Sequence, residues 1–156
     1  MHVRLLAVGT RAPAWVRQGY DDYARRLGPG LKLTLVQIEP GRRAAGGDVR
    51  AALETEGRRL LAAVRDGEFL VALDEHGTQM TTARFADWLA ERMRAGRNLA
   101  IMAGGPDGFA PQVRARADFL LSLSALTLPH ALVRIVLAEQ LYRALSIHAR
   151  HPYHRA

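Results

Sequence analysis

Residues 121–130 read Leu-Ser-Leu-Ser-Ala-Leu-Thr-Leu-Pro-His and join a short apolar strand to a long, almost wholly apolar helix. Serine and threonine side chains are interspersed here with leucine side chains, and the main chain offers further hydrogen-bonding groups. Such a segment can hold an adenine ring by main-chain hydrogen bonds while Leu123, Leu126 and Leu128 pack around it. The same composition also suits a strand end followed by a helix cap. Both interpretations place this junction at the centre of the fold.

Upstream of the junction, apolar runs alternate with helical patterns along the whole chain. Strand-like runs occupy 3–8, 31–39, 68–73, 98–103 and 119–123. Helical spacing is found at 14–27, 48–64, 83–95, 110–117 and 131–148, with Asp48 and either Thr81 or Thr82 as expected N-caps. The alternation predicts an α/β fold: a single domain over 1–156, with a mostly parallel sheet and helices on both faces.

Composition excludes several kinds of chemistry. The chain has 156 residues and no cysteine, which rules out a thiolate nucleophile, a cysteine zinc site and an iron–sulfur cluster. The absence of cysteine also fits a reducing compartment. No apolar run approaches the roughly 20 residues that span a bilayer, and the N-terminal run is too short for a signal peptide. We therefore expect a cytoplasmic protein that does not enter the membrane.

The charge balance points to an anionic partner. The net charge is +7, and the basic residues are 21 arginines and one lysine. A surplus of this size favours salt-dependent binding to a phosphate-rich polymer such as RNA. An incidentally basic surface is the alternative interpretation.

A glycine-rich loop, Gly-Gly-Pro-Asp-Gly at 104–108, follows a predicted strand and precedes a predicted helix. Loops in this context often receive cofactors. This one lacks the Gly-x-Gly-x-x-Gly spacing, and Asp107 lies where a phosphate would need amide donors and positive charge. The loop therefore suits a ligand without phosphates, such as an adenosyl group with a cationic sulfonium. A tight strand-to-helix turn is the simpler explanation.

The helix at 131–148 is apolar around most of its circumference. Its polar residues lie on one narrow stripe: Glu139, Gln140, Arg143 and Ser146. A helix of this kind is central in a core or part of a subunit interface, and we expect a homodimer. Arg134 lies on the apolar side, where it would hold a carboxylate or reach a substrate. Snorkelling from the first turn of the helix is the alternative for Arg134.

The chain ends in His-Pro-Tyr-His-Arg at 151–155, although flexible termini rarely concentrate rings in this way. We do not expect His148, His151 and His154 to bind a metal, because Pro152 breaks the helix that would align them. Tyr153, His154 and Arg155 are better interpreted as a polar lid over a site. A disordered tail is the alternative.

Six segments together resemble the ribosomal RNA large-subunit methyltransferase H family of the SPOUT superfamily. They are Leu-Ala-Val-Gly-Thr at 6–10, the loop at 104–108, the segment at 121–130, Arg134, Glu-Gln-Leu-Tyr-Arg-Ala at 139–144, and the tail. The resemblance covers essentially the whole chain. It implies a C-terminal trefoil knot, a homodimer, S-adenosylmethionine as cofactor, and methylation of N3 of a pseudouridine in helix 69 of 23S ribosomal RNA on the assembled ribosome.

The resemblance also implies a cofactor site. Its residues would be Leu73, Gly104, Leu123, Ser124, Ala125, Leu126, Thr127 and Leu128. For the chemistry, an imide N3–H must lose its proton before nitrogen attacks the methyl group. Tyr153 or His154 could take this proton, while Arg134, Arg143 or Arg155 could stabilise the developing oxyanion. The residues do not identify the base uniquely.

Two other classes of protein share some of these features. A non-enzymatic RNA- or ribosome-binding module would explain the basic charge, but it would not bind the cofactor. A nicotinamide-dependent oxidoreductase is disfavoured by the missing glycine fingerprint and by Asp107. Because methylation of a pyrimidine carbon commonly uses a thiolate, the lack of cysteine favours transfer to nitrogen or to ribose oxygen.

Overall fold

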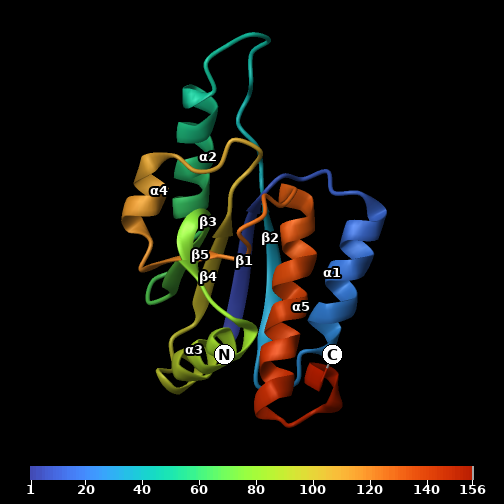
Figure 1. The fold of residues 1–156 in the computed structure, drawn as a ribbon. Helices are drawn as coiled ribbons and strands as arrows, with labels where there is room; N and C mark the ends of the chain where they lie inside the picture. The colour runs from blue at the N-terminus through green and yellow to red at the C-terminus, as the bar shows by residue number, and fades with distance from the viewer. Residues whose placement is uncertain (156) are drawn as a thin grey trace.

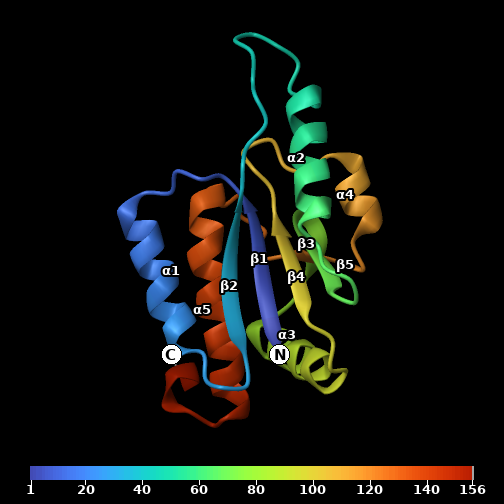
Figure 2. The same cartoon turned by 180° about the vertical axis from the view of Figure 1, so that it is seen from behind.

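The computed structural model describes residues 1–155, without the side chain of Arg155. Five parallel strands form one sheet in the order β2-β1-β4-β3-β5 (Figure 1, Figure 2). The strands are β1 (His2–Val8), β2 (Lys32–Ile38), β3 (Phe69–Gln79), β4 (Leu99–Ala103) and β5 (Phe119–Ser122). The helices are α1 (Ala14–Arg26), α2 (Arg50–Ala62), α3 (Thr82–Arg94), α4 (Pro111–Arg116), α5 (His130–His148) and the 3₁₀ helix η1 (Pro152–Arg155). The predicted α/β fold with a parallel sheet is confirmed.

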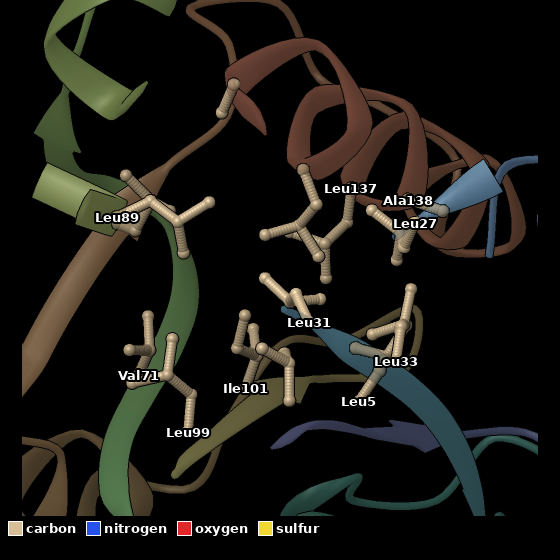
Figure 3. Packing of buried hydrophobic residues seen from close by; sticks show 14 of the residues in the cluster. Leu5, Leu27, Leu31, Leu33, Val71, Leu89, Leu99, Ile101, Leu137 and Ala138 are labelled. Carbon is tan, nitrogen blue, oxygen red and sulfur yellow. The ribbon is translucent and has the colours of Figure 1, made fainter. Parts of the chain in front are cut away.

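Two apolar layers lie on opposite faces of the sheet, because successive side chains of a strand point to opposite sides. Leu5 and Ile101 pack with Leu137 under α1, α3 and α5 (Figure 3). Leu6 and Met102 belong to the second layer, which α2 and α4 cover. Burying a side chain of this size contributes about 1.5–3 kcal/mol. Helices therefore cover both faces, as predicted.

Strand β3 is longer than the sequence predicted and carries a bulge. The expected strand ended at residue 73, but β3 runs to Gln79, and both Leu73 and Thr78 pair with Leu121. A Cβ atom on Gly77 would lie 2.8 Å from the backbone of Leu120, so only glycine allows this close approach. The bulge places Asp74 inside the fold, where the residue is only 7% exposed. Bulges of this kind often aim a side chain into a functional site.

The helix starts agree with the sequence at one position and differ at another. Thr81 caps α3, since its hydroxyl accepts a hydrogen bond from the Arg84 N–H. Asp48 accepts from the Arg50 N–H at 2.8 Å, which is the side-chain contact expected of an N-cap, although α2 as assigned begins one residue later, after Val49. The segment 40–49 forms an arm that extends beyond the rest of the fold at the top of Figure 1.

The polar side of helix α5 differs from the prediction at one residue. Ser146 does not lie on the polar stripe; it is 3% exposed, and its hydroxyl donates to the Tyr142 carbonyl. The Ser146 carbonyl accepts from the His151 N–H, which starts the turn into η1. Among residues 1–155, no helix has both the length and the apolar character that a membrane-spanning segment needs.

Candidate active site

A cavity of about 360 Å³ lies at the carboxyl ends of β3, β4 and β5; we call it the first cavity. In open α/β sheets this is the edge at which ligands bind. Its volume falls within the range of small-molecule sites. Three separate segments contribute most of its wall: 73–75, 103–109 and 121–128.

The first cavity brings together nearly all the residues expected to bind the cofactor. Its wall contains Leu73, Gly104, Leu123, Ser124, Leu126, Thr127 and Leu128. Ala125 lies in the same loop but is not part of the wall. Leu126 is 76% exposed, so a ligand seated here would cover an otherwise solvated apolar side chain.

The loop at 122–128 is held by its own serines. The Ser122 hydroxyl donates to the Ser124 carbonyl at 3.0 Å, and the Ser124 hydroxyl accepts from the Leu126 N–H at 2.9 Å. Within the described part of the chain, the main-chain groups of Ala125, Thr127 and Leu128 have no hydrogen-bond partner. These groups can therefore recognise the edge of a planar ring.

The glycine-rich loop is both a tight turn and a wall of the first cavity. The Gly108 N–H donates to the Gly105 carbonyl at 3.1 Å, and Gly108 has a φ of +78°, which favours glycine. A Cβ atom on Gly104 would lie 2.6 Å from the Gly108 carbonyl oxygen. The two interpretations of this loop are thus compatible.

Asp74 is a residue of the cavity wall to which the sequence analysis assigned no role. Its carboxylate accepts from Arg114 at 2.5 Å and from the His76 N–H at 2.9 Å. Burial alone would raise the pKa of Asp74, but these hydrogen bonds outweigh it and hold the pKa below its usual value. Asp74 therefore carries a charge at neutral pH. The sequence gives one indication that Asp74 belongs to a site: it directly follows the apolar run 68–73.

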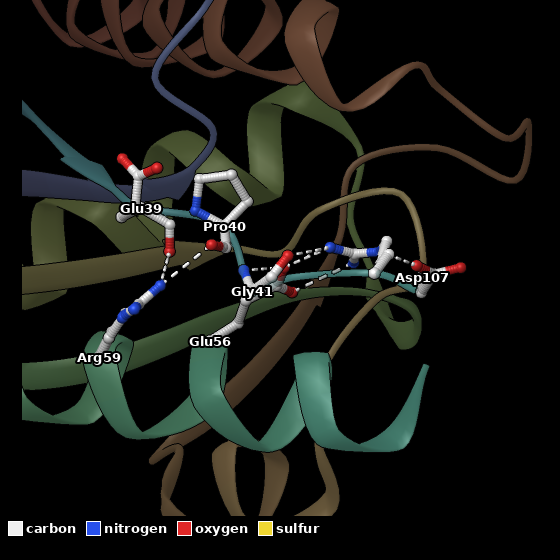
Figure 4. Close-up of polar contacts among 7 residues, drawn as sticks. Glu39, Pro40, Gly41, Glu56, Arg59 and Asp107 are labelled. Carbon is white, nitrogen blue, oxygen red and sulfur yellow. Dashed lines mark hydrogen bonds and ion pairs between the residues drawn. The ribbon is translucent and has the colours of Figure 1, made fainter. Parts of the chain in front are cut away.

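Arg43 ties the arm to the glycine-rich loop through hydrogen bonds to Glu56 and Asp107, the two carboxylates labelled at this junction in Figure 4. Its guanidinium donates to Glu56 at 2.7 Å and to Asp107 at 2.7 Å. Glu56 is only 2% exposed and also accepts from the Gly41 N–H. The hydrogen bond to Glu56, followed by the one to Asp107, raises the pKa of Arg43. Asp107 is therefore charge-paired and oriented by a side chain from the arm.

We expect Arg43→Ala to weaken cofactor binding several-fold and to lower the free energy of unfolding by about 1–3 kcal/mol, because a buried carboxylate loses its charged partner. Arg42→Ala is the matched control, since Arg42 is the neighbouring arginine of the arm and is exposed. Calorimetric titration and chemical denaturation measure the two effects. If the two variants had the same cofactor affinity and the same free energy of unfolding, the role assigned to Arg43 would be wrong.

Arg134 is buried, with 2% of its surface exposed, so it does not snorkel to solvent. Its NH2 group donates to the Gly9 carbonyl at 2.7 Å, and its NH1 group has no partner within the described residues. Burial lowers the pKa of Arg134. None of the carboxylates of residues 1–155 forms an ion pair with it, so the expected carboxylate partner is not seen.

The tail residues 151–154 pack on the C-terminal half of α5 and do not line the first cavity. The cavity wall includes Val133 of α5, and Glu139, the α5 residue bonded to the tail, lies about 9 Å further along the helix. The Tyr153 hydroxyl donates to Glu139 at 3.1 Å, and the Arg143 guanidinium lies 4.8 Å from the Tyr153 ring centre. Residues 151–154 are thus folded onto the helix, which overturns the alternative of a disordered tail for these residues.

Within one chain, Tyr153 and His154 therefore do not cover the first cavity. Burial, together with hydrogen bonds to Tyr23 and Glu139, raises the pKa of Tyr153, so this phenol keeps its proton at neutral pH. The Arg155 side chain lies outside the described residues. Across residues 1–155, no group of three or more side chains could hold a metal ion.

Comparisons with known proteins agree with this geometry. Residues 1–154 match the family described as "Predicted SPOUT methyltransferase". The chain is 51% identical over 156 residues, covering 100% of both chains, to ribosomal RNA large subunit methyltransferase H from Stenotrophomonas maltophilia (strain K279a). It is 53% identical, also over 100% of both chains, to the protein of the same name from Alkalilimnicola ehrlichii.

Two solved structures share the fold. A protein described as a methylase family member from Neisseria gonorrhoeae aligns with a TM-score of 0.54 and 16% identity, covering 90% of this chain and 81% of that one. Another from Haemophilus influenzae Rd KW20 aligns with a TM-score of 0.54 and 14% identity, covering 95% and 68%. This chain belongs to the SPOUT methyltransferases and, among them, to the ribosomal RNA large subunit methyltransferase H family.

Proposed function

We propose that the chain transfers a methyl group from S-adenosylmethionine to N3 of a pseudouridine in helix 69 of 23S ribosomal RNA, on the assembled ribosome. The observation that carries the proposal is the first cavity, where three distant segments converge at the ligand-binding edge of the sheet. Relatives named ribosomal RNA large subunit methyltransferase H and a net charge of +7 support an RNA substrate.

The residues of the first cavity fit S-adenosylmethionine. Leucine side chains and the unpartnered main-chain groups of Ala125, Thr127 and Leu128 suit its adenine ring. The cofactor has no phosphate, and Arg114, the arginine in the cavity wall, is bound to Asp74 and so is not free to hold one. The carboxylates of Asp74, Glu75 and Asp107 line the wall and are compatible with a cationic ligand.

When bound, the cofactor supplies a methyl group on a positively charged sulfur. The remaining work falls to the protein: it must hold the acceptor nitrogen in line with the methyl group and accept the N3 proton. Of the two expected acceptors, His154 would take the proton, directly or through water, because the Tyr153 phenol already holds its own proton at neutral pH. Arg134, Arg143 and Arg155 would stabilise the negative charge on the base or hold neighbouring phosphates.

We infer that the chain works as a homodimer in which the tail of one subunit covers the first cavity of the other. The packing of the tail supports this arrangement, since Tyr153 lies on Tyr142 and Glu139 and none of residues 151–154 lines the first cavity of its own chain. Helix α5 also presents half-buried apolar residues that a second subunit would cover: Leu132, Val136 and Ile147. The C-terminal trefoil knot, the single domain over 1–156 and the cytoplasmic location remain predictions.

The test uses purified protein, S-adenosylmethionine, and ribosomes that lack the modification, followed by mass spectrometry of the nucleosides. N3-methylpseudouridine located in helix 69 is the expected product, and protein-free 23S RNA is the comparison substrate. Titration with the cofactor is measured in parallel. Ribosome binding without cofactor binding or methyl transfer would instead support the non-enzymatic RNA-binding module.

A further inference from the structure

A second cavity of about 490 Å³ lies beside the first and has no part in cofactor binding as described above. Its wall comes from the β1–α1 loop, the end of β2 and the start of α5. His130 lines both cavities, so they adjoin at the first turn of α5. The second cavity therefore opens at the same edge of the sheet as the first.

Arg134 contributes to the wall of the second cavity, and its NH1 nitrogen is buried without a hydrogen-bond partner among residues 1–155. A buried guanidinium without a carboxylate is costly, because desolvation is not repaid by an opposite charge. The fold maintains this arrangement with Gly9, whose φ is +116° and whose Cβ would lie 3.2 Å from the Arg134 NH2 atom. An unpartnered buried donor lining a cavity marks a place for a ligand with acceptor oxygens.

We propose that the second cavity receives the acceptor base and that Arg134 donates to the carbonyl oxygen next to the reacting nitrogen. This inference rests on the proposed methyltransferase function. Methyl transfer requires the nitrogen to lie about 3–3.5 Å from the methyl carbon, so the base must occupy a space contiguous with the cofactor site. The two cavities share His130 in their walls, so a base in the second cavity would lie next to the cofactor site.

The negative charge that develops on the acceptor base during the reaction is one that the Arg134 guanidinium can stabilise. The N3–H bond breaks and its proton passes to a base; the nitrogen electron pair forms the new bond to the methyl carbon. The carbon–sulfur bond breaks and its electrons stay on sulfur, which becomes neutral. Before the transfer, the negative charge of the deprotonated imide is shared with its carbonyl oxygens, where Arg134 stabilises it.

Arg134 also selects the class of base. A guanidinium has only donors, so it matches a carbonyl oxygen and opposes an exocyclic amino group. A uracil-type ring has carbonyl groups on both sides of N3, whereas cytosine has an amino group on one side. The site therefore fits uridine or pseudouridine and disfavours cytidine.

Filling the second cavity tests this assignment without touching Arg134. Ala131 lines the second cavity but not the first, and it lies in the first turn of α5. Ala131→Leu should lower methyl transfer to ribosomes at least about 100-fold, with cofactor affinity, fold and oligomeric state unchanged. Ala90→Leu, at another half-buried helical position, is the control and should keep the wild-type rate.

Arg134→Lys tests the donor itself. The loss of one transition-state donor should lower kcat by about 100- to 1,000-fold while cofactor affinity is kept. Because the bound imide then ionises less readily, the rise of the rate with pH should move to higher pH, which a purely structural role would not produce. A wild-type rate in Ala131→Leu, or an unshifted pH profile in Arg134→Lys, would overturn the assignment. Wild-type protein that binds ribosomes but methylates no RNA would overturn the proposed function itself.

Discussion

A chain that ends at Arg150 is expected to lose methyl transfer by at least about 100-fold and to keep its fold. The tail carries the candidate proton acceptor, and general acid–base groups commonly contribute 10²- to 10⁴-fold to a rate. Residues 151–154 pack on Tyr142 and Glu139 of α5, outside both apolar layers. Their removal should therefore leave the sheet and its main helices intact.

The measurement is single-turnover transfer to ribosomes, with circular dichroism and gel filtration as checks on fold and dimer. His154→Ala in the full chain separates loss of the imidazole from loss of packing. Mixing the truncated chain with a Gly104→Val chain tests the cross-subunit arrangement: each alone should be inactive, and mixed dimers should regain transfer. Full activity of the truncated chain would refute the tail's role.

Gly104→Ala is expected to weaken S-adenosylmethionine binding by at least about 100-fold. The new Cβ would lie 2.6 Å from the Gly108 carbonyl oxygen, a main-chain atom that cannot turn aside. The loop must then open, and the wall of the first cavity moves with it. The loss corresponds to about 2.7 kcal/mol of binding free energy.

Gly28→Ala provides the matched control for that change. No atom lies within 4 Å of a Cβ built on Gly28, which follows the end of α1. We expect wild-type affinity for the cofactor and a free energy of unfolding within about 1 kcal/mol of wild type. Calorimetric titration of the two variants makes the comparison. If Gly104→Ala bound the cofactor as tightly as wild type, the first cavity would not be the cofactor site.

Periodicity predicted the fold class because each apolar run is short and each is followed by a helix or turn signal. Its errors are local and have physical causes. Strand β3 continues past residue 73 because Gly77 lets the chain approach Leu120, and this closeness depends on a neighbour distant in sequence. Ser146 is buried because the chain turns back after α5, and a helical wheel does not include the segment that covers it.

The cofactor-binding residues and the tail residues of the candidate site were predictable from the sequence to different extents. The family resemblance supplied seven residues that the fold does bring to one cavity wall, whereas composition alone left the 121–130 segment ambiguous. The position of the tail depends on contacts with residues distant in sequence, such as Tyr23 of α1, which residue types alone do not reveal. A knot is a property of the whole path of the chain, so no periodicity can indicate it.

The strand order has a consequence for how the protein is made. Strand β1 lies between β2 and β4, and the His2 N–H donates to Asn98, 96 residues further along the chain. During synthesis β1 can pair with β2 early, but its other edge has no partner until β4 has left the exit tunnel. At about 5–20 residues per second this wait lasts several seconds. The N-terminal half is thus the part that most needs protection from aggregation while the chain is still attached to the ribosome that makes it.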